Sequence, residues 1–71
     1  MTEGKCEIVV LQPVGDFNLV QVAVNGVLSV PFWDSREYSK MLSEDLFLAH
    51  LYEVGSQMVM TYGDARKQKV N

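Results

Sequence analysis

The sequence predicts an α+β fold: a three-stranded antiparallel meander, then one main helix, then a short fourth strand. Two observations predict it. Valine-rich runs separated by turn residues fill the first thirty positions, a pattern typical of strands. From about residue 35, apolar residues recur at helical spacing. A chain of 71 residues, 48% apolar and 21% charged, suits one compact domain, residues 1–71. Its polar ends, 1–5 and 64–71, are expected to be flexible.

The first two strands are expected at residues 6–12 and 17–24. Ile8-Val9-Val10-Leu11 is a β-branched apolar run, which is typical of a buried strand. Pro13-Val14-Gly15-Asp16 has the composition of a turn. The valine-rich segment after this turn forms the second strand.

Asn25-Gly26 is the strongest hairpin signal in the chain. A type I′ turn requires positive φ at both central positions, which asparagine and glycine tolerate. The third strand is therefore expected at residues 27–30, with Pro31 ending it.

This hairpin makes both faces of the sheet apolar. A two-residue loop places Val20, Val22, Val24 and Val27 on one face, and Leu19, Ala23, Leu28 and Val30 on the other. A sheet with one solvated face should instead alternate apolar and polar residues. One helix covers one face only, so the other face requires loops, the N-terminal segment or another chain.

The helix is expected at residues 35–53, and its start is well marked. Asp34 suits an N-cap, and Glu37 three residues later suits the reciprocal position of a capping box. Trp33 before the cap and Tyr38 after it form a hydrophobic staple.

A break or bend near Ser43 is the alternative to an unbroken helix. Asp45 falls inside the apolar stripe of an unbroken helix, where a charge is costly, whereas Ser43-Glu44-Asp45 resembles a second helix start. Gly55 is expected to form a left-handed C-terminal cap. Residues 57–62 then form the fourth strand, with a second short helix as the alternative.

The helix carries two apolar stripes. At about 100° per residue, a broad core stripe contains Tyr38, Met41, Leu42, Leu46, Leu48, Ala49 and Tyr52. Phe47, Leu51 and Val54 lie nearly opposite, and His50 borders them. Three interpretations stay open: loops or the C-terminal strand cover this second stripe, it contacts a dimer mate or another protein, or the helix is broken.

The sequence contains no constellation of catalytic or metal-binding residues. A zinc site requires three or four His and Cys ligands, and the chain has one His and one Cys. His50 is interpreted as a partly exposed helix residue and Cys6 as a strand thiol. The glycines form no phosphate-binding loop. We therefore expect no catalytic residue, no cofactor, no metal and no enzymatic activity.

Charge and cysteine content bear on partners and location. The net charge of −3 disfavours general affinity for nucleic acid, and the basic cluster at Arg66, Lys67 and Lys69 is small. The uncharged run 17–33 contains Asn, Gln, Gly and Pro, so it is not a membrane span, and no secretory signal begins the chain. A lone cysteine suits a reducing compartment, hence a cytoplasmic location.

These observations favour a non-enzymatic intracellular protein–protein interaction module. It would be a small acidic accessory, adaptor or inhibitor protein, of the kind that phages also encode, acting as a homodimer. Its partner or dimer interface is expected at Phe47, His50, Leu51 and Val54. Two alternatives stay open: a nucleic-acid-associated regulator that uses the basic C-terminal tail, and an enzyme whose site is completed across a dimer interface.

Overall fold

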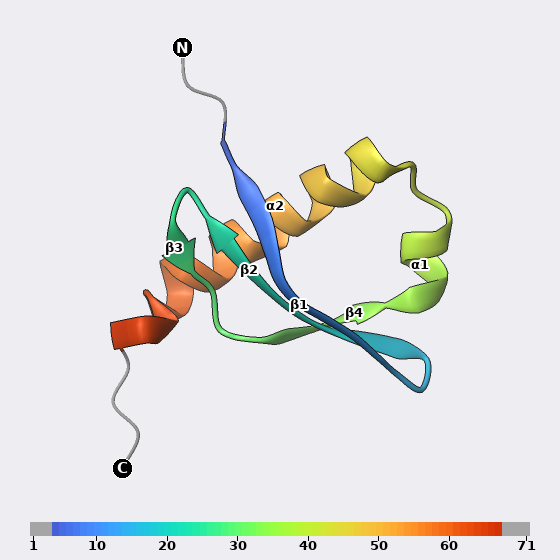
Figure 1. Cartoon of the computed structure of the whole chain (residues 1–71), viewed down its shortest axis with the longest axis horizontal. Coiled ribbons are helices and arrows are strands. Elements are labelled where there is room, and N and C mark those ends of the chain that lie inside the picture. The colour runs from blue at the N-terminus through green and yellow to red at the C-terminus, as the bar shows by residue number, and fades with distance from the viewer. Residues whose placement is uncertain (1–3, 68–71) are drawn as a thin grey trace.

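A computed structural model describes residues 4–67. It confirms the α+β class: an antiparallel sheet lies over one long helix, with a short helix at one end (Figure 1). Within residues 4–67 no helix is both long and apolar enough to span a bilayer. The elements in order are β1 (Cys6–Val14), β2 (Phe17–Val24), β3 (Val27–Leu28), β4 (Phe32–Ser35), α1 (Arg36–Lys40), α2 (Glu44–Tyr62) and a 3₁₀ turn, η1 (Ala65–Lys67).

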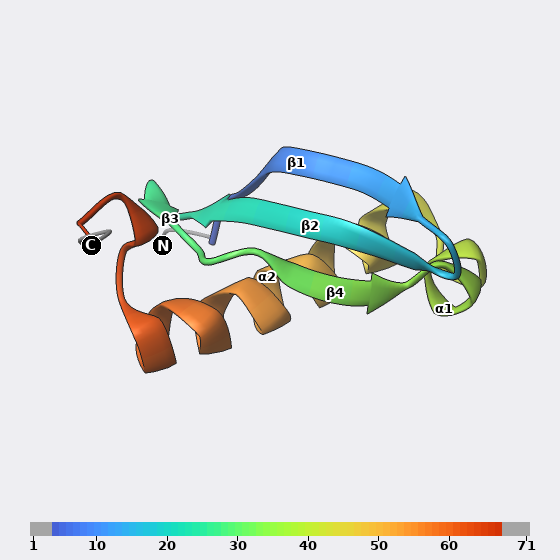
Figure 2. The same cartoon turned by 90° about the horizontal axis from the view of Figure 1, so that it is seen from below.

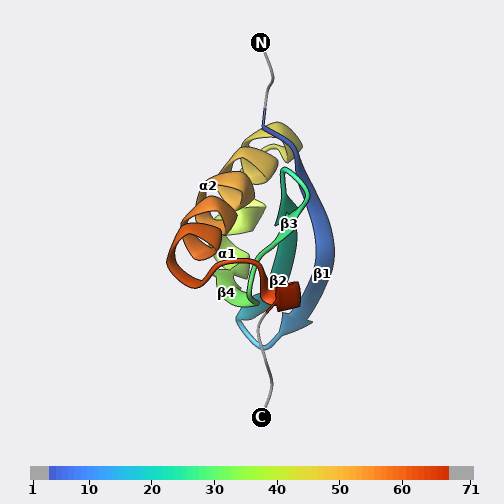
Figure 3. The same cartoon turned by 90° about the vertical axis from the view of Figure 1, so that its left-hand side faces the viewer.

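Strand β2 lies at the centre of the sheet. Strand β1 pairs along one side of it. On its other side, β3 pairs with Ala23 and Val24 and β4 pairs with residues 17–20. Helix α2 lies against one side of this sheet only, as Figures 2 and 3 show from two directions. Residues 4–67 therefore form two layers, and none of their helices covers the face of the sheet away from α2.

The two hairpin turns follow the sequence closely. Asn25 and Gly26 have φ values of 52° and 83°, and Val24 pairs with Val27, which confirms the predicted two-residue turn. The first turn is shorter than expected. Val14 pairs with Phe17, so β1 continues through the proline and only Gly15-Asp16 form the loop. The strand expected at residues 6–12 is confirmed, but the burial expected for residues 8–11 is wrong, because β1 is an edge strand and most of it is exposed.

Strand β4 was not expected, and it changes the start of the helix. Asp34 belongs to this strand, where it pairs with Asn18 and is buried. The N-cap of α1 is Ser35, whose Oγ accepts from the Tyr38 N–H at 3.2 Å. The predicted Asp34 capping box is therefore wrong, and with it the staple, because Trp33 lies in β4 and points away from the helical layer.

The unbroken helix expected over residues 35–53 is wrong, and the alternative, a break near Ser43, is confirmed. Helix α1 ends at Lys40 and α2 begins at Glu44. The Ser43 Oγ accepts from the Leu46 N–H at 3.3 Å and caps α2. Asp45 lies exposed in the first turn of α2, where a carboxylate complements the positive end of the helix dipole.

Helix α2 continues without interruption to Tyr62, so the strand predicted at 57–62 is wrong and the fourth strand of the sheet is β4. Gly55 is not a cap. It is buried inside α2, and a Cβ added there would lie 2.5 Å from the Cγ2 of Val22 and 2.8 Å from that of Val24. The C-cap of α2 is Gly63, with a φ of 79°.

The core lies between β2, β4 and α2. Its buried members are Val20, Val22, Val24, Phe32 and Leu51, with Cys6, Phe47, Tyr52, Val54 and Met58 packed against them. The face of α2 that meets the sheet is thus the second stripe, and the predicted core stripe is mostly solvent-facing: Met41 is 78% exposed and Leu46 58%. The break contributes to this difference between predicted and observed core faces. Tyr38, Met41 and Leu42 of the predicted stripe precede Ser43, so they do not share the helical phase of α2.

The chain ends are described only in part. Residues 64–67, expected to be flexible, include the η1 turn, in which the Arg66 N–H donates to Asp64 Oδ1 at 3.0 Å. Residues 1–3 and 68–71, including Lys69 of the basic cluster, lie outside the described residues.

Candidate interaction surface

The four residues predicted to form an interface lie on the side of α2 that faces the sheet. Leu51 is fully buried in the core, and Phe47 and Val54 pack half-buried against it. Leu51 is therefore unavailable to a partner in this fold. The sheet itself covers this stripe. None of the three interpretations, which invoked loops or the C-terminal strand, a partner, or a broken helix, named the sheet.

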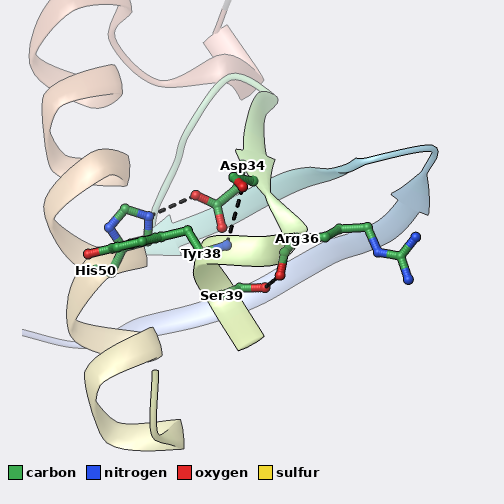
Figure 4. Close-up of polar contacts among 6 residues, drawn as sticks. Asp34, Arg36, Tyr38, Ser39 and His50 are labelled. Carbon is green, nitrogen blue, oxygen red and sulfur yellow. Dashed lines mark hydrogen bonds and ion pairs between the residues drawn. The ribbon is translucent and has the colours of Figure 1, made fainter. Parts of the chain in front are cut away.

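His50 forms a polar contact between layers. Its Nε2 lies 2.8 Å from Oδ1 of Asp34, and the Tyr38 ring meets the imidazole edge-on, with centroids 5.1 Å apart (Figure 4). The side chains of His50 and Asp34 are 24% and 8% exposed. Oδ2 of Asp34 is buried and has no hydrogen-bond partner among residues 4–67. The pair joins β4 to α2 at the edge of the apolar core.

Within residues 4–67, the serines close in sequence to Asp34 offer this pair no free hydroxyl. The two serines nearest to it in sequence are engaged with the backbone: Ser39 Oγ donates to the Arg36 carbonyl at 2.9 Å, and Ser35 Oγ caps α1. A histidine that activates a hydroxyl requires that hydroxyl within hydrogen-bond reach. The contact is a hydrogen bond between a strand and a helix.

The opposite face of the sheet carries the largest exposed aromatic side chains of the strands. Cross-strand pairing aligns Val14 with Phe17, and Leu19 with Trp33, and the period-2 pleat puts these side chains on the side away from α2. Trp33 is 60% exposed, Phe17 51% and Val14 45%. We call Val10, Val14, Phe17, Leu19 and Trp33 the outer patch.

The outer patch surrounds a hollow. Val14, Phe17 and Trp33 line an open depression of about 380 Å³. Tryptophan and phenylalanine are enriched at protein interfaces, and exposed apolar patches on monomers are often functional. The outer side of the described strands carries one charge, Glu7, at the far end of β1 from the hollow.

Two other depressions are more polar. One, of about 490 Å³, lies at the start of α1 and combines Arg36 and Lys40 with Asp16 and Glu37, so its charges balance. Arg36 Nη1 also donates to the Gly15 carbonyl at 2.7 Å.

The other, of about 590 Å³, lies between the start of β1 and α2 and includes Cys6. Burial raises the pKa of the Cys6 thiol, which disfavours the nucleophilic thiolate. Across the described segment, no three His, Cys, Asp or Glu side chains are grouped so that they could hold a metal ion.

Sequence reasoning came close to the outer patch without naming it. The hairpin register indicated that both sheet faces were apolar, and Leu19 was placed on the second face. Trp33 was missed because it was assigned to a helix start, and the short strand that aligns it with Leu19 leaves no periodic signal in four residues.

Comparison of the chain with models of protein families, with curated proteins and with solved structures finds no match.

Proposed function

We propose that this chain is a non-enzymatic protein–protein interaction module and that the outer patch is its contact surface. The observation that carries the proposal is the hollow formed by Val14, Phe17 and Trp33, three apolar side chains that are each 45–60% exposed. No other element within residues 4–67 forms a layer over this side of the sheet.

Exposing these side chains is costly. Each Å² of apolar surface removed from water is worth about 25 cal/mol, and Trp and Phe side chains present about 150–250 Å² each. A chain of this size has little stability to spare. Retaining two half-exposed aromatic rings beside each other is therefore best explained by a contact that covers them.

The rest of the molecule supports a binding role over a chemical one. Within residues 4–67, the serines nearest in sequence to Asp34 are engaged with the backbone, and burial raises the pKa of the Cys6 thiol, which disfavours its thiolate. The proposal places the protein in the cytoplasm, as an accessory, adaptor or inhibitor, because its single cysteine suits a reducing compartment.

Site-specific photo-crosslinking in the native host tests this proposal. Phe17 is replaced by p-benzoyl-phenylalanine, an aromatic of related shape. Met60, which is 85% exposed on α2, is replaced in a matched control. We expect irradiation to give discrete protein adducts from position 17 and few from position 60. Adducts that are absent from position 17, or equal at both positions, would contradict the assignment of the surface.

A further inference from the structure

The free edges of the sheet are poorly suited to pairing with another strand. Strand β1 is the longer edge, but its register shifts between Ile8 and Val10, which marks a bulge, and Pro13 has no N–H to donate. Bulges and prolines on edge strands oppose edge-to-edge pairing. The opposite edge is formed by strands of two and four residues. A partner is therefore better accommodated on a face of the sheet than along its edge.

We infer that the occupant of the outer patch is a second copy of this chain. The inference rests on the proposed function and specifies the partner. A twofold dimer uses the same patch on both copies, so the patch must supply both a projection and a recess. Trp33, 60% exposed, is the projection, and the hollow beside it is the recess. In the dimer, Trp33 of each copy enters the hollow of the other.

The area available fits a weak dimer. Eight residues at about 3.3 Å each and three strands about 4.8 Å apart give an outer face of roughly 400 Å² per copy. Two such faces bury roughly 800 Å² in total, at the low end of specific interfaces, where association is weak or transient. We therefore expect a reversible dimer with a dissociation constant in the micromolar range.

Charge distinguishes a second copy from a partner held by opposite charge. Each chain carries a net charge of −3, while the outer patch itself is uncharged. Two copies repel each other at long range and attract only through apolar contact. Salt screens the repulsion, so the association of two copies should strengthen as salt rises. A basic partner would be held less tightly under the same change.

The test is sedimentation of the purified chain, from a few micromolar to several hundred micromolar, at low and physiological salt. Trp33 is the only tryptophan, so its fluorescence reports the proposed contact directly. We expect the mass to rise from monomer to dimer and the emission to shift to shorter wavelength over the same concentrations. Higher salt should move both changes to lower concentration.

Variants assign the surface. Phe17→Glu keeps the tryptophan reporter and should raise the dissociation constant at least about tenfold, equivalent to about 1.4 kcal/mol, with an unchanged circular dichroism spectrum. Met60→Glu introduces the same charge on α2 and should leave association unchanged. If Phe17→Glu fails to fold, Val14→Lys at the other side of the hollow replaces it.

Each other outcome overturns the inference. A chain that stays monomeric at all concentrations overturns the inferred dimer. The crosslinking result then shows whether the proposed function fails as well. Adducts from position 17 to a different protein leave the proposed function standing, whereas their absence removes both. A dimer without a fluorescence shift, or one unaffected by Phe17→Glu, lies on another surface. Association that weakens with salt is not the apolar contact inferred.

Discussion

Asp34 shows how much the role of a residue depends on whether a strand or a helix contains it. In the sequence it is a good helix cap, but in the fold the cap is the next residue, Ser35, and the pleat of β4 turns the Asp34 carboxylate under the sheet. Oδ1 of Asp34 lies 2.8 Å from Nε2 of His50. Oδ2 is buried and has no hydrogen-bond partner among the described residues. A buried carboxylate is costly unless it is hydrogen-bonded, so the histidine contact offsets part of that cost.

This pairing predicts coupling between Asp34 and His50. Asp34→Ala and His50→Ala, alone and together, should give a coupling free energy of about 1–3 kcal/mol, the range for a hydrogen bond that involves a charged group. Urea unfolding of the four proteins measures it. Glu37→Ala serves as the control, because it is exposed and should change the free energy of unfolding by no more than about 0.5 kcal/mol. Strict additivity of Asp34 and His50 would show that the contact contributes nothing.

Cys6 gives a prediction with pH. Burial raises its pKa above the ordinary value of 9.0, so the thiol holds its proton in the folded chain at pH values where the unfolded chain has lost it. Between these two pKa values the unfolded state binds fewer protons, and stability falls as pH rises. Below about pH 9 the contribution is fully present. The wild type should therefore lose stability relative to Cys6→Ala as pH rises above 9, measured by urea unfolding. Parallel curves for the two proteins would contradict the raised pKa.

At the scale of elements, the sequence predicted structure well wherever the signal was local. The Asn25-Gly26 turn requires only two residues that tolerate positive φ, and the Ser43 start of α2 requires only a cap followed by acids. Strand β4 has no such signal, because four residues that follow a proline become a strand only by pairing with β2. Gly55 was misassigned for the same reason. Its close contact with the sheet is a tertiary feature that resembles a C-terminal cap in sequence.

The packing of α2 on the sheet predicts that Gly55→Ala is destabilising. The added Cβ would lie 2.5 Å from Val22 Cγ2, and a β-branched side chain held in a strand cannot turn away. Overpacking costs about 1–3 kcal/mol, whereas alanine improves helix propensity by only about 1 kcal/mol. We expect a net loss of about 1 kcal/mol in urea unfolding. Gln57→Ala, at an exposed position of the same helix, should change stability by less than about 0.5 kcal/mol. A stabilised Gly55→Ala would show that helix and sheet can separate without cost.

At the scale of the whole molecule, α2 covers one face of the sheet, while the other face of the described strands leaves apolar side chains exposed. The core that α2 covers is small: among the described residues, its buried members number five. The other side of the sheet presents aromatic rings to solvent. That surplus was visible in the hairpin pattern, which is why the sequence indicated an additional contact. The sequence placed that contact on α2, whereas the structure packs the stripe of Phe47, Leu51 and Val54 against the sheet. Which stripe of α2 meets the sheet depends on the break at Ser43 and on the helix continuing to Tyr62.

If two copies associate through the outer patch, the stability of the protein should increase with its concentration. Mass action then stabilises the folded state increasingly as protein concentration exceeds the dissociation constant. We therefore expect the thermal midpoint of the wild type to rise as protein concentration increases through the micromolar range. Phe17→Glu, which places a charge in the contact, should have a midpoint that does not change with concentration, whereas Met60→Glu should behave like the wild type. A midpoint that does not change with wild-type concentration, with reversible unfolding, would show that the folded chain gains no stability from self-association. The inferred homodimer would then be wrong, and any partner of the outer patch would be a different molecule.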